Sequence, residues 1–154
     1  MGSETRYLEK EIFFFDGEMT AAVRNAGGSV ALTNVTAVDS AVGVAHSSGS
    51  TAVRNCIVYG NTAQISGSPT VTYSDVEGGF SGTGNMDKDP VFKSPGMEDY
   101  HLTVASPCID AGDPGDSYAN EPEPNGGRID MGAYGNASQA AITIPEAEGI
   151  SDSQ

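Results

Sequence analysis

An internal repeat of 21 residues constrains the fold of this chain more than any other feature. Residues 20–40 read TAAVRNAGGSVALTNVTAVDS, and residues 41–61, AVGVAHSSGSTAVRNCIVYGN, align with them without a gap. Apolar positions stay apolar, as in the pairs Val23 with Val44, Leu32 with Val53, and Ala37 with Val58. Ile65 belongs to a third, shortened copy. A unit of this length cannot bury an apolar face alone, so successive copies are expected to stack into a solenoid.

The residue types within the repeat indicate the kind of solenoid. A leucine-rich repeat needs a ladder of leucines that this chain lacks, and the helical repeats are longer. Short β-type runs separated by Gly, Ser and Asn favour parallel strands instead. We predict an all-β fold, a right-handed parallel β-helix of about three coils of ~21 residues with a loop-rich C-terminal cap. The expected inward ladders are Leu32, Val53 and Val71; Val35, Cys56 and Ser74; and Ala37, Val58 and Val76.

Two asparagines stand at matching positions of the repeat. Asn34 and Asn55 fall between the two strands expected in each coil, which places them at a corner. Stacked amides at such a corner can hydrogen-bond to one another and to the turn backbone. We therefore interpret both residues as structural.

The repeat and the text around it divide the chain into four segments. We place an N-terminal cap or partial coil at residues 1–19 and the β-helix coils at residues 20–79. A C-terminal capping region follows at residues 80–135, and residues 136–154 form an acidic tail or linker. An uncovered edge on the first coil would pair with another chain, so self-association through the N-terminal edge is one hypothesis.

Three stretches follow the repeat in a fixed order. They are GTGNMDKDPVF at residues 82–92, DYHLTVASPCIDAGDP at residues 99–114 and GRIDMGAYG at residues 127–135. Together with NCI at residues 55–57 and YSD at residues 73–75, they resemble the C-terminal region of bacterial right-handed parallel β-helix repeat surface proteins. Those proteins have a pectate-lyase-like fold and a choice-of-anchor type C-terminus. The resemblance implies an extracellular or cell-surface location. The third stretch departs from the family pattern at Gly135, where those proteins commonly have Glu.

The same stretches look like a lid for the last coil. Asp89-Pro90 and Ser106-Pro107 set rigid turns. Five apolar residues of these stretches are spaced to form a layer on the last coil, and Arg128 is placed to pair with a nearby carboxylate. The residues of this expected layer are Phe92, Leu102, Ile109, Met131 and Tyr134.

The net charge of −14 excludes one class of partner. An acidic surface repels phosphate backbones, so we expect no nucleic-acid partner. No apolar run is long enough for a membrane span. The short apolar run Ile12–Phe15 is flanked by acids, so we identify no signal peptide in this chain.

Acidic loops are the candidate cation sites. Asp110, Asp113 and Asp116 recur every third residue in a Gly- and Pro-rich loop. Carboxylate oxygens are the ligands that calcium prefers, although this spacing matches no EF-hand loop. The alternative is that these side chains accept backbone N–H groups in turns. Calcium is therefore the one cofactor that the sequence suggests.

No catalytic residues are marked in the sequence. The histidines, His46 and His101, lack a sequence-marked nucleophile or orienting acid, and we interpret both as structural. Outward aromatic rings on a β-helix can stack on sugars, and Tyr59 and Tyr73 are the candidates. We expect a non-catalytic structural module, or one that binds a polysaccharide or cell-surface glycan. The alternatives are the terminal part of a β-helix polysaccharide lyase or glycoside hydrolase, and an oligomerisation unit.

The two cysteines, Cys56 and Cys108, leave two states open. They are compatible with one disulfide or with two buried thiols.

Overall fold

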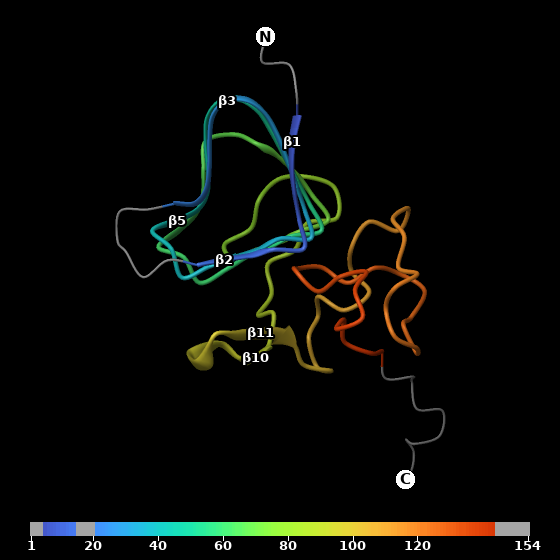
Figure 1. Cartoon of the computed structure of the whole chain (residues 1–154). Coiled ribbons are helices and arrows are strands. Elements are labelled where there is room, and N and C mark those ends of the chain that lie inside the picture. Colours follow the sequence, from blue (N-terminus) through green and yellow to red (C-terminus); the bar gives the residue numbers. More distant parts are fainter. Residues whose placement is uncertain (1–4, 15–20, 144–154) are drawn as a thin grey trace.

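The computed structural model describes residues 5–14 and 21–143, and it shows strands stacked in parallel coils (Figure 1). The first sheet has the order β1-β3-β5-β7, and β8 pairs with β5. Its strands are β1 (Thr5–Glu9), β3 (Ala21–Thr33), β5 (Val42–Arg54), β7 (Ala63–Ser66) and β8 (Thr70–Thr72). The second sheet has the order β2-β4-β6-β9. Its strands are β2 (Ile12–Phe14), β4 (Thr36–Val38), β6 (Ile57–Val58) and β9 (Asp75–Val76). All pairs in both sheets are parallel, so the predicted parallel β-helix is confirmed.

The repeat register agrees with the observed pairing. Leu32 lies opposite Val53, which lies opposite Val71, and each side chain is 1% exposed. The ladder of Ala37, Val58 and Val76 is also buried. Leucine and valine side chains of both ladders belong to one apolar core inside the coils. Because neighbouring coils place like side chains on one another, the 21-residue spacing is a direct consequence of parallel pairing.

Each coil turns its corner through one residue in the left-handed region. The corner residues have φ values of 55° at Lys10, 54° at Asn34, 57° at Asn55 and 48° at Tyr73. Asn tolerates this conformation better than most residues, which explains its place in the two full repeats. Gly84 supplies the next corner with φ 73°, and a Cβ there would lie 2.2 Å from the Tyr73 ring. Only glycine fits beneath that tyrosine.

Residues 5–14 form a partial coil. The sequence had suggested either a cap or a partial coil for the N-terminal segment. β1 pairs with β3, and β2 pairs with β4. Leu8 and Phe13 pack against the core of the coils. Residues 1–4 and 15–19 of that segment lie outside the described residues. Within residues 5–14 and 21–143, no further strand pairs with the outer edges of β1 and β2.

The last coil is closed by a short loop rather than by the apolar layer. Tyr73 N donates to Thr83 O, and Val76 N donates to Met86 O. Met86 also makes a parallel bridge with Asp75. This loop therefore supplies hydrogen-bond partners to backbone groups at the strand edge that ends the stack.

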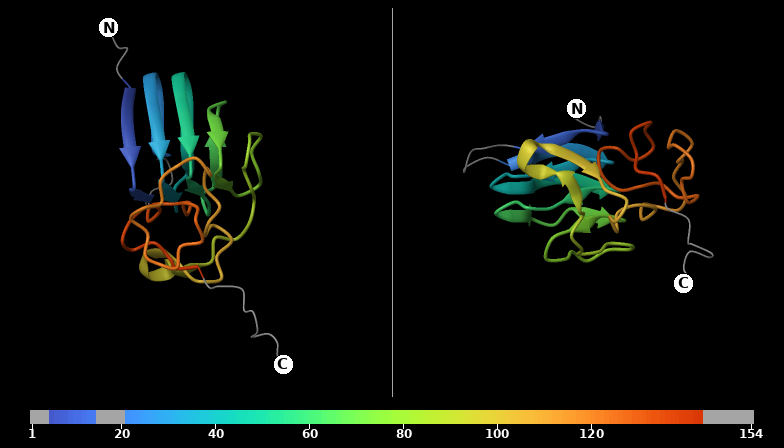
Figure 2. Two further views of the ribbon diagram at one scale, coloured as in Figure 1. Left: turned by 90° about the vertical axis from the view of Figure 1, so that its right-hand side faces the viewer. Right: turned by 90° about the horizontal axis from the view of Figure 1, so that it is seen from below.

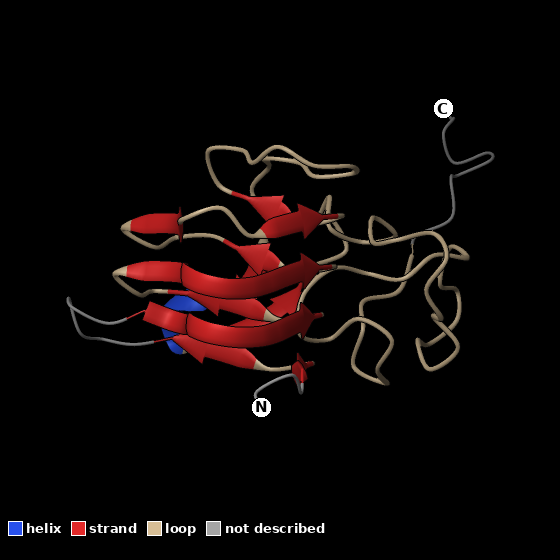
Figure 3. Ribbon diagram, turned by 90° about the horizontal axis from the view of Figure 1, so that it is seen from above, coloured by secondary structure: helices blue, strands red, loops and turns tan. Residues whose placement is uncertain are grey.

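The rest of the cap lies along the side of the coils (Figures 2 and 3). It contains an antiparallel hairpin, β10 (Phe92–Ser94) and β11 (Asp99–Leu102), joined through the 3₁₀ turn η1 (Pro95–Met97). Leu102, Cys108 and Met131 pack on Ile57, which belongs to a coil inside the stack. Alternation along β6 turns Val58 inward and Ile57 outward, so an apolar side chain on the outer wall requires cover.

The expected apolar layer on the last coil is therefore in a different place. Phe92, Ile109 and the buried cap residues cover the side wall around Ile57. Tyr134 stacks on His101 with the ring centroids 3.9 Å apart. The cap also extends further than the sequence suggested, because Ala140, in the predicted tail, is buried. The remainder of that tail, residues 144–154, lies outside the described residues. Among the described residues, the structure contains no helix long and apolar enough to cross a membrane.

Candidate functional site

The corner asparagines attach the cap to the coils. Asn34 Nδ2 donates to Asp130 O at 2.9 Å and to Gly132 O at 3.1 Å. Asn55 Oδ1 accepts from Asp113 N at 2.7 Å, and its backbone oxygen accepts from Gly132 N at 2.9 Å. Asn34 also reaches Asn55 O, at 3.4 Å. The structural role expected for both residues is confirmed, but their amides point mainly to the cap.

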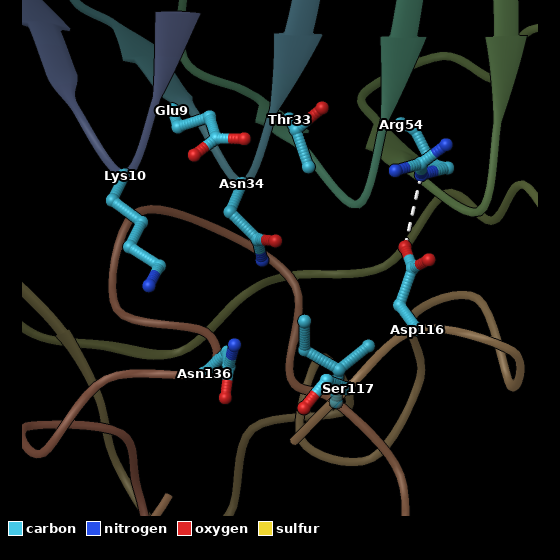
Figure 4. A pocket seen from close by; sticks show the side chains of 9 residues that line it. Glu9, Lys10, Thr33, Asn34, Arg54, Asp116, Ser117 and Asn136 are labelled. Atoms are coloured by element: carbon cyan, nitrogen blue, oxygen red, sulfur yellow. Dashed lines mark ion pairs between the residues drawn. The ribbon is translucent and has the colours of Figure 1, made fainter. Parts of the chain in front are cut away.

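A polar pocket of about 160 Å³ lies where these corners meet the cap (Figure 4). Arg54 Nε pairs with Asp116 Oδ2 at 2.9 Å, and the same oxygen accepts from Asn55 Nδ2 at 2.7 Å. Glu9 and Lys10, from the partial coil, line the other side. The charged groups balance, and the best-placed carboxylate is already engaged. We therefore assign this pocket to the attachment of the cap.

The three predicted calcium ligands have separate roles. Asp113 Oδ1 accepts from Gly115 N at 2.9 Å in its own turn, and Asp116 faces Arg54. Asp110 Oδ2 accepts from Thr143 Oγ1 at 2.8 Å. In the part of the chain that the structure describes, no group of three His, Cys, Asp or Glu side chains is arranged to hold a metal ion. Calcium binding stays a prediction.

Buried acids inside the cap were not found from the sequence. Asp130 is 1% exposed and accepts from Asp110 N, while Glu121 accepts from the backbone N–H groups of Asp130 and Asn136. Burial is the main cause that raises the pKa of Asp130 to about 8, and neighbouring carboxylates add to it. Each of Asp110, Glu121 and Asp130 keeps one buried oxygen without a hydrogen bond. The only sequence signal near Asp130 was the Asp-Met-Gly motif of residues 130–132, which did not indicate that the acid is buried.

A groove of about 350 Å³ lies between the side wall of the coils and the hairpin. The coils contribute the ends of β4 and β6, with Asp39 and Tyr59. The hairpin side contributes Asp89, Phe92 and Tyr100. Its remaining lining residues are Val38, Gly60, Pro90, Val91 and Pro95. The groove combines aromatic surface with carboxylate acceptors, which makes it the candidate binding site.

Two contacts fix the shape of the groove. Tyr100 donates its hydroxyl hydrogen to Asp39 Oδ2 at 2.5 Å, which joins the hairpin to the coil corner. Phe92 and Tyr100 meet edge to face with ring centroids 5.2 Å apart. Burial of its hydroxyl raises the pKa of Tyr100, and the neighbouring Asp39 carboxylate raises it further. The wall that carries Phe92 is therefore held by a charged hydrogen bond and by ring packing.

The electrostatics of the groove are acidic. Partial burial raises the pKa of Tyr59, and the carboxylates of Glu77, Asp89, Asp75 and Asp87 raise it further. Within residues 5–14 and 21–143, no Lys, Arg or His lines the groove. A ligand there meets a negative potential and a hydrophobic ring together.

Only one of the two predicted stacking tyrosines reaches this groove. Tyr59 lines it, whereas Tyr73 is not among its lining residues. Tyr73 lies over Gly84, and the Arg128 guanidinium carbon is 6.0 Å from its ring centroid. Arg128 donates through Nε to Gly112 O at 2.5 Å, in place of the carboxylate expected from the sequence. Tyr73 and Arg128 thus support the cap.

The two cysteines are free and buried. Cys56 Sγ donates to Arg54 O at 3.2 Å, and Cys108 Sγ donates to Asp75 Oδ2 at 3.2 Å. Burial raises the pKa of Cys56 to about 12 and raises that of Cys108 as well. Desolvation also raises the pKa of Asp75 to about 6. The sequence left open one disulfide or two buried thiols, and the structure contains two buried thiols.

The histidines lie outside the groove. His46 Nδ1 is 2.9 Å from Thr51 Oγ1, within the first sheet. His101 lies between Asp99 Oδ1, at 2.6 Å, and Gln139 Oε1, at 2.7 Å. The hydrogen bond from His101 lowers the pKa of Asp99.

Comparisons with family models, with curated proteins and with solved structures gave no match.

Proposed function

We propose that this chain is a non-catalytic carbohydrate-binding module that takes a glycan in the groove beside Tyr59. The observation that carries the proposal is the pairing of exposed aromatic surface with free carboxylate oxygens in one hollow. The apolar face of a sugar ring packs on aromatic side chains, while its hydroxyl groups donate to acids at the rim. A secreted or cell-surface location belongs to the same proposal and rests on the resemblance of the cap motifs.

The size of the groove suits a short segment of a glycan. Its volume of about 350 Å³ is near the lower end of small-molecule sites. Tyr59 and Phe92 are each partly exposed and stand on different elements, so a bound ring has two surfaces to contact. Asp39 and Asp89 are exposed at its rim.

Binding is favoured over the enzymatic alternative by the composition of the lining. Lyases of the β-helix group resemble one another in calcium-binding acids beside a basic residue. In the part of the chain that the structure describes, the groove residues include two carboxylates and no basic side chain. The one arginine of the described ion pairs, Arg54, is engaged with Asp116 in the polar pocket.

Calorimetric titration with neutral oligosaccharides tests the proposal. Tyr59→Ala is expected to weaken binding roughly three- to tenfold, which corresponds to the loss of one stacked ring. Tyr7→Ala is the matched control, because Tyr7 is 71% exposed on β1 and away from the groove. No heat with any glycan, or equal losses in the two variants, would reject the proposal.

A further inference from the structure

The charge of the groove selects among glycans. Among the described residues, its only ionisable lining groups, apart from the tyrosine hydroxyls, are the carboxylates of Asp39 and Asp89. Both side chains are exposed at the rim, so a ligand can reach them. Asp39 already accepts one hydrogen bond from Tyr100, through Oδ2, and Asp89 accepts one from Val91 N, through Oδ1. Each carboxylate therefore keeps acceptor capacity for a ligand.

Further acids add to the negative potential at Tyr59. Glu77, Asp87 and Asp75 act on the Tyr59 hydroxyl together with Asp89. Lys88 precedes Asp89 and Lys93 follows Phe92 in the sequence, but neither lysine lines the groove. With a net charge of −14 for the whole chain, the potential in the groove attracts cations.

We propose, on the basis of the carbohydrate-binding function above, that the groove recognises glycans carrying a free protonated amine, such as deacetylated hexosamine units. A sugar ammonium group offers several N–H donors to the carboxylates of Asp39 and Asp89. Charge-assisted hydrogen bonds of this kind are about twice as strong as neutral ones. The face of Tyr59 or Phe92 also attracts a cation through its quadrupole.

The same charges act against other glycans. A uronate or a sulfated sugar would place its anion beside two carboxylates, and like charges at short range cost free energy. An N-acetylated hexosamine keeps the ring and the hydroxyl groups but loses the cation. The amine is therefore the group that distinguishes the preferred ligand from its closest neutral analogue.

Matched oligosaccharides of equal length test the inference: glucosamine, N-acetylglucosamine and uronic acid oligomers, titrated into the intact chain. We expect the glucosamine oligomer to bind at least tenfold more tightly than the acetylated one, and the uronic acid oligomer to bind most weakly. The advantage of the amine should shrink as salt is raised, because the rim charges are exposed to screening.

The double variant Asp39→Asn with Asp89→Asn tests the residues. Asn keeps an acceptor for Tyr100 and for Val91, and it tolerates the left-handed backbone of Asp39, which has φ 52°. The double variant should lose the preference for the amine, so that the free and the acetylated oligomers bind this variant with similar affinity. Glu9→Gln with Glu11→Gln is the control, since it removes the same charge from the partial coil.

The outcomes separate the two proposals. Equal affinity for the free and acetylated oligomers would overturn the amine preference and leave the carbohydrate-binding function standing. An equal loss in the control pair would assign the effect to net charge and would also overturn the inference. No binding of any oligomer would reject both.

Discussion

The side chain of Asn55 donates through Nδ2 to Asp116 Oδ2 at 2.7 Å, across a separation of 61 residues. The same asparagine is fully buried and turns its coil through a φ of 57°. One residue therefore sets a corner of the β-helix and binds the cap. Sequence repetition accounts for the first role, and the three-dimensional fold reveals the second.

Substitution of Asn55 should separate these two roles. Asn55→Gly keeps the left-handed corner and removes the amide, which leaves Asp113 N without its acceptor, at a cost of about 2 kcal/mol. Asn55→Ala removes the amide and also strains the corner, so it should cost roughly 1–2 kcal/mol more. Urea denaturation of the two variants measures the difference. Equal stabilities would show that the corner carries no backbone demand.

Tyr100→Phe should loosen the hairpin. The substitution removes the hydroxyl that bonds to Asp39 and keeps the ring that meets Phe92. Hydrogen bonds to charged groups contribute about 1.5–3 kcal/mol, so the free energy of unfolding should fall by about that amount. A double-mutant cycle with Asp39→Gly, which keeps the left-handed backbone at φ 52° and removes the acceptor, isolates the pair. A coupling energy near zero would contradict the assignment.

The stability of the chain should depend on pH through Asp75. Its side chain is fully buried, and its pKa rises from 3.8 to about 6 in the folded protein. The folded state therefore holds this proton more tightly than the unfolded state does. The stabilisation is complete below pH 4, is lost as pH rises through about 6, and amounts to about 3 kcal/mol at most.

The variant Asp75→Asn is the test of that dependence. Burial is the main cause of the shift, Asp87 and Asp89 add to it, and the Lys88 N–H and the Cys108 thiol oppose it. Asn still accepts from Lys88 N, but it carries no titrating proton. The stability difference between the variant and the parent should change across pH 4–6 and stay constant above. A constant difference over the whole range would exclude Asp75 as the source.

Calcium should act at the buried side of Asp110 if the sequence-based hypothesis holds. Its Oδ1 lies buried without a hydrogen bond, whereas Asp113 Oδ1 is engaged by Gly115 N. Calcium at 100 times its dissociation constant would add about 2.7 kcal/mol to stability. The hypothesis names Asp110, Asp113 and Asp116 as ligands, so Asp110→Asn, Asp113→Ala and Asp116→Ala should each reduce this rise in the unfolding midpoint. Identical midpoints in calcium and in chelator would end the calcium hypothesis.

Both thiols should resist modification until the chain unfolds. Cys56 and Cys108 are buried, and burial raises the pKa of each thiol, so the reactive thiolate is scarce. A chromogenic thiol reagent should react with neither in native buffer and with both in denaturant. Intact mass should be the same with and without reductant. A difference of two hydrogens would reveal a disulfide and contradict the structure.

The coils could be predicted because parallel stacking repeats its own pattern. Leu32 and Val53 reveal their pairing through a fixed offset and a shared apolar character. The cap has no such internal check. Ile57 reads as one more apolar residue of the repeat, and only the alternation along a strand of two residues turns it outward, where Met131 covers it.

The candidate site was predictable in part for the same reason. Tyr59 was proposed because an outward aromatic ring on a β-helix can stack on a sugar, and it does line the groove. Its neighbours Asp39, Phe92 and Tyr100 come from positions up to 61 residues apart, and only the folded cap brings them together. Tyr73 was proposed beside it, but it turns a corner of the coil, at the repeat position of Asn55, and lies outside the groove.

The way Gly132 joins two neighbouring coils bears on how such a protein can grow. Its N–H reaches Asn55 O and its carbonyl accepts from Asn34, so this one residue spans a single coil step. A duplicated 21-residue unit placed between those asparagines would move one of them out of reach. The same unit added before Ala21 would leave every one of these bonds intact. Lengthening by duplication is therefore tolerated in one direction only, and variation in coil number should accumulate on the N-terminal side.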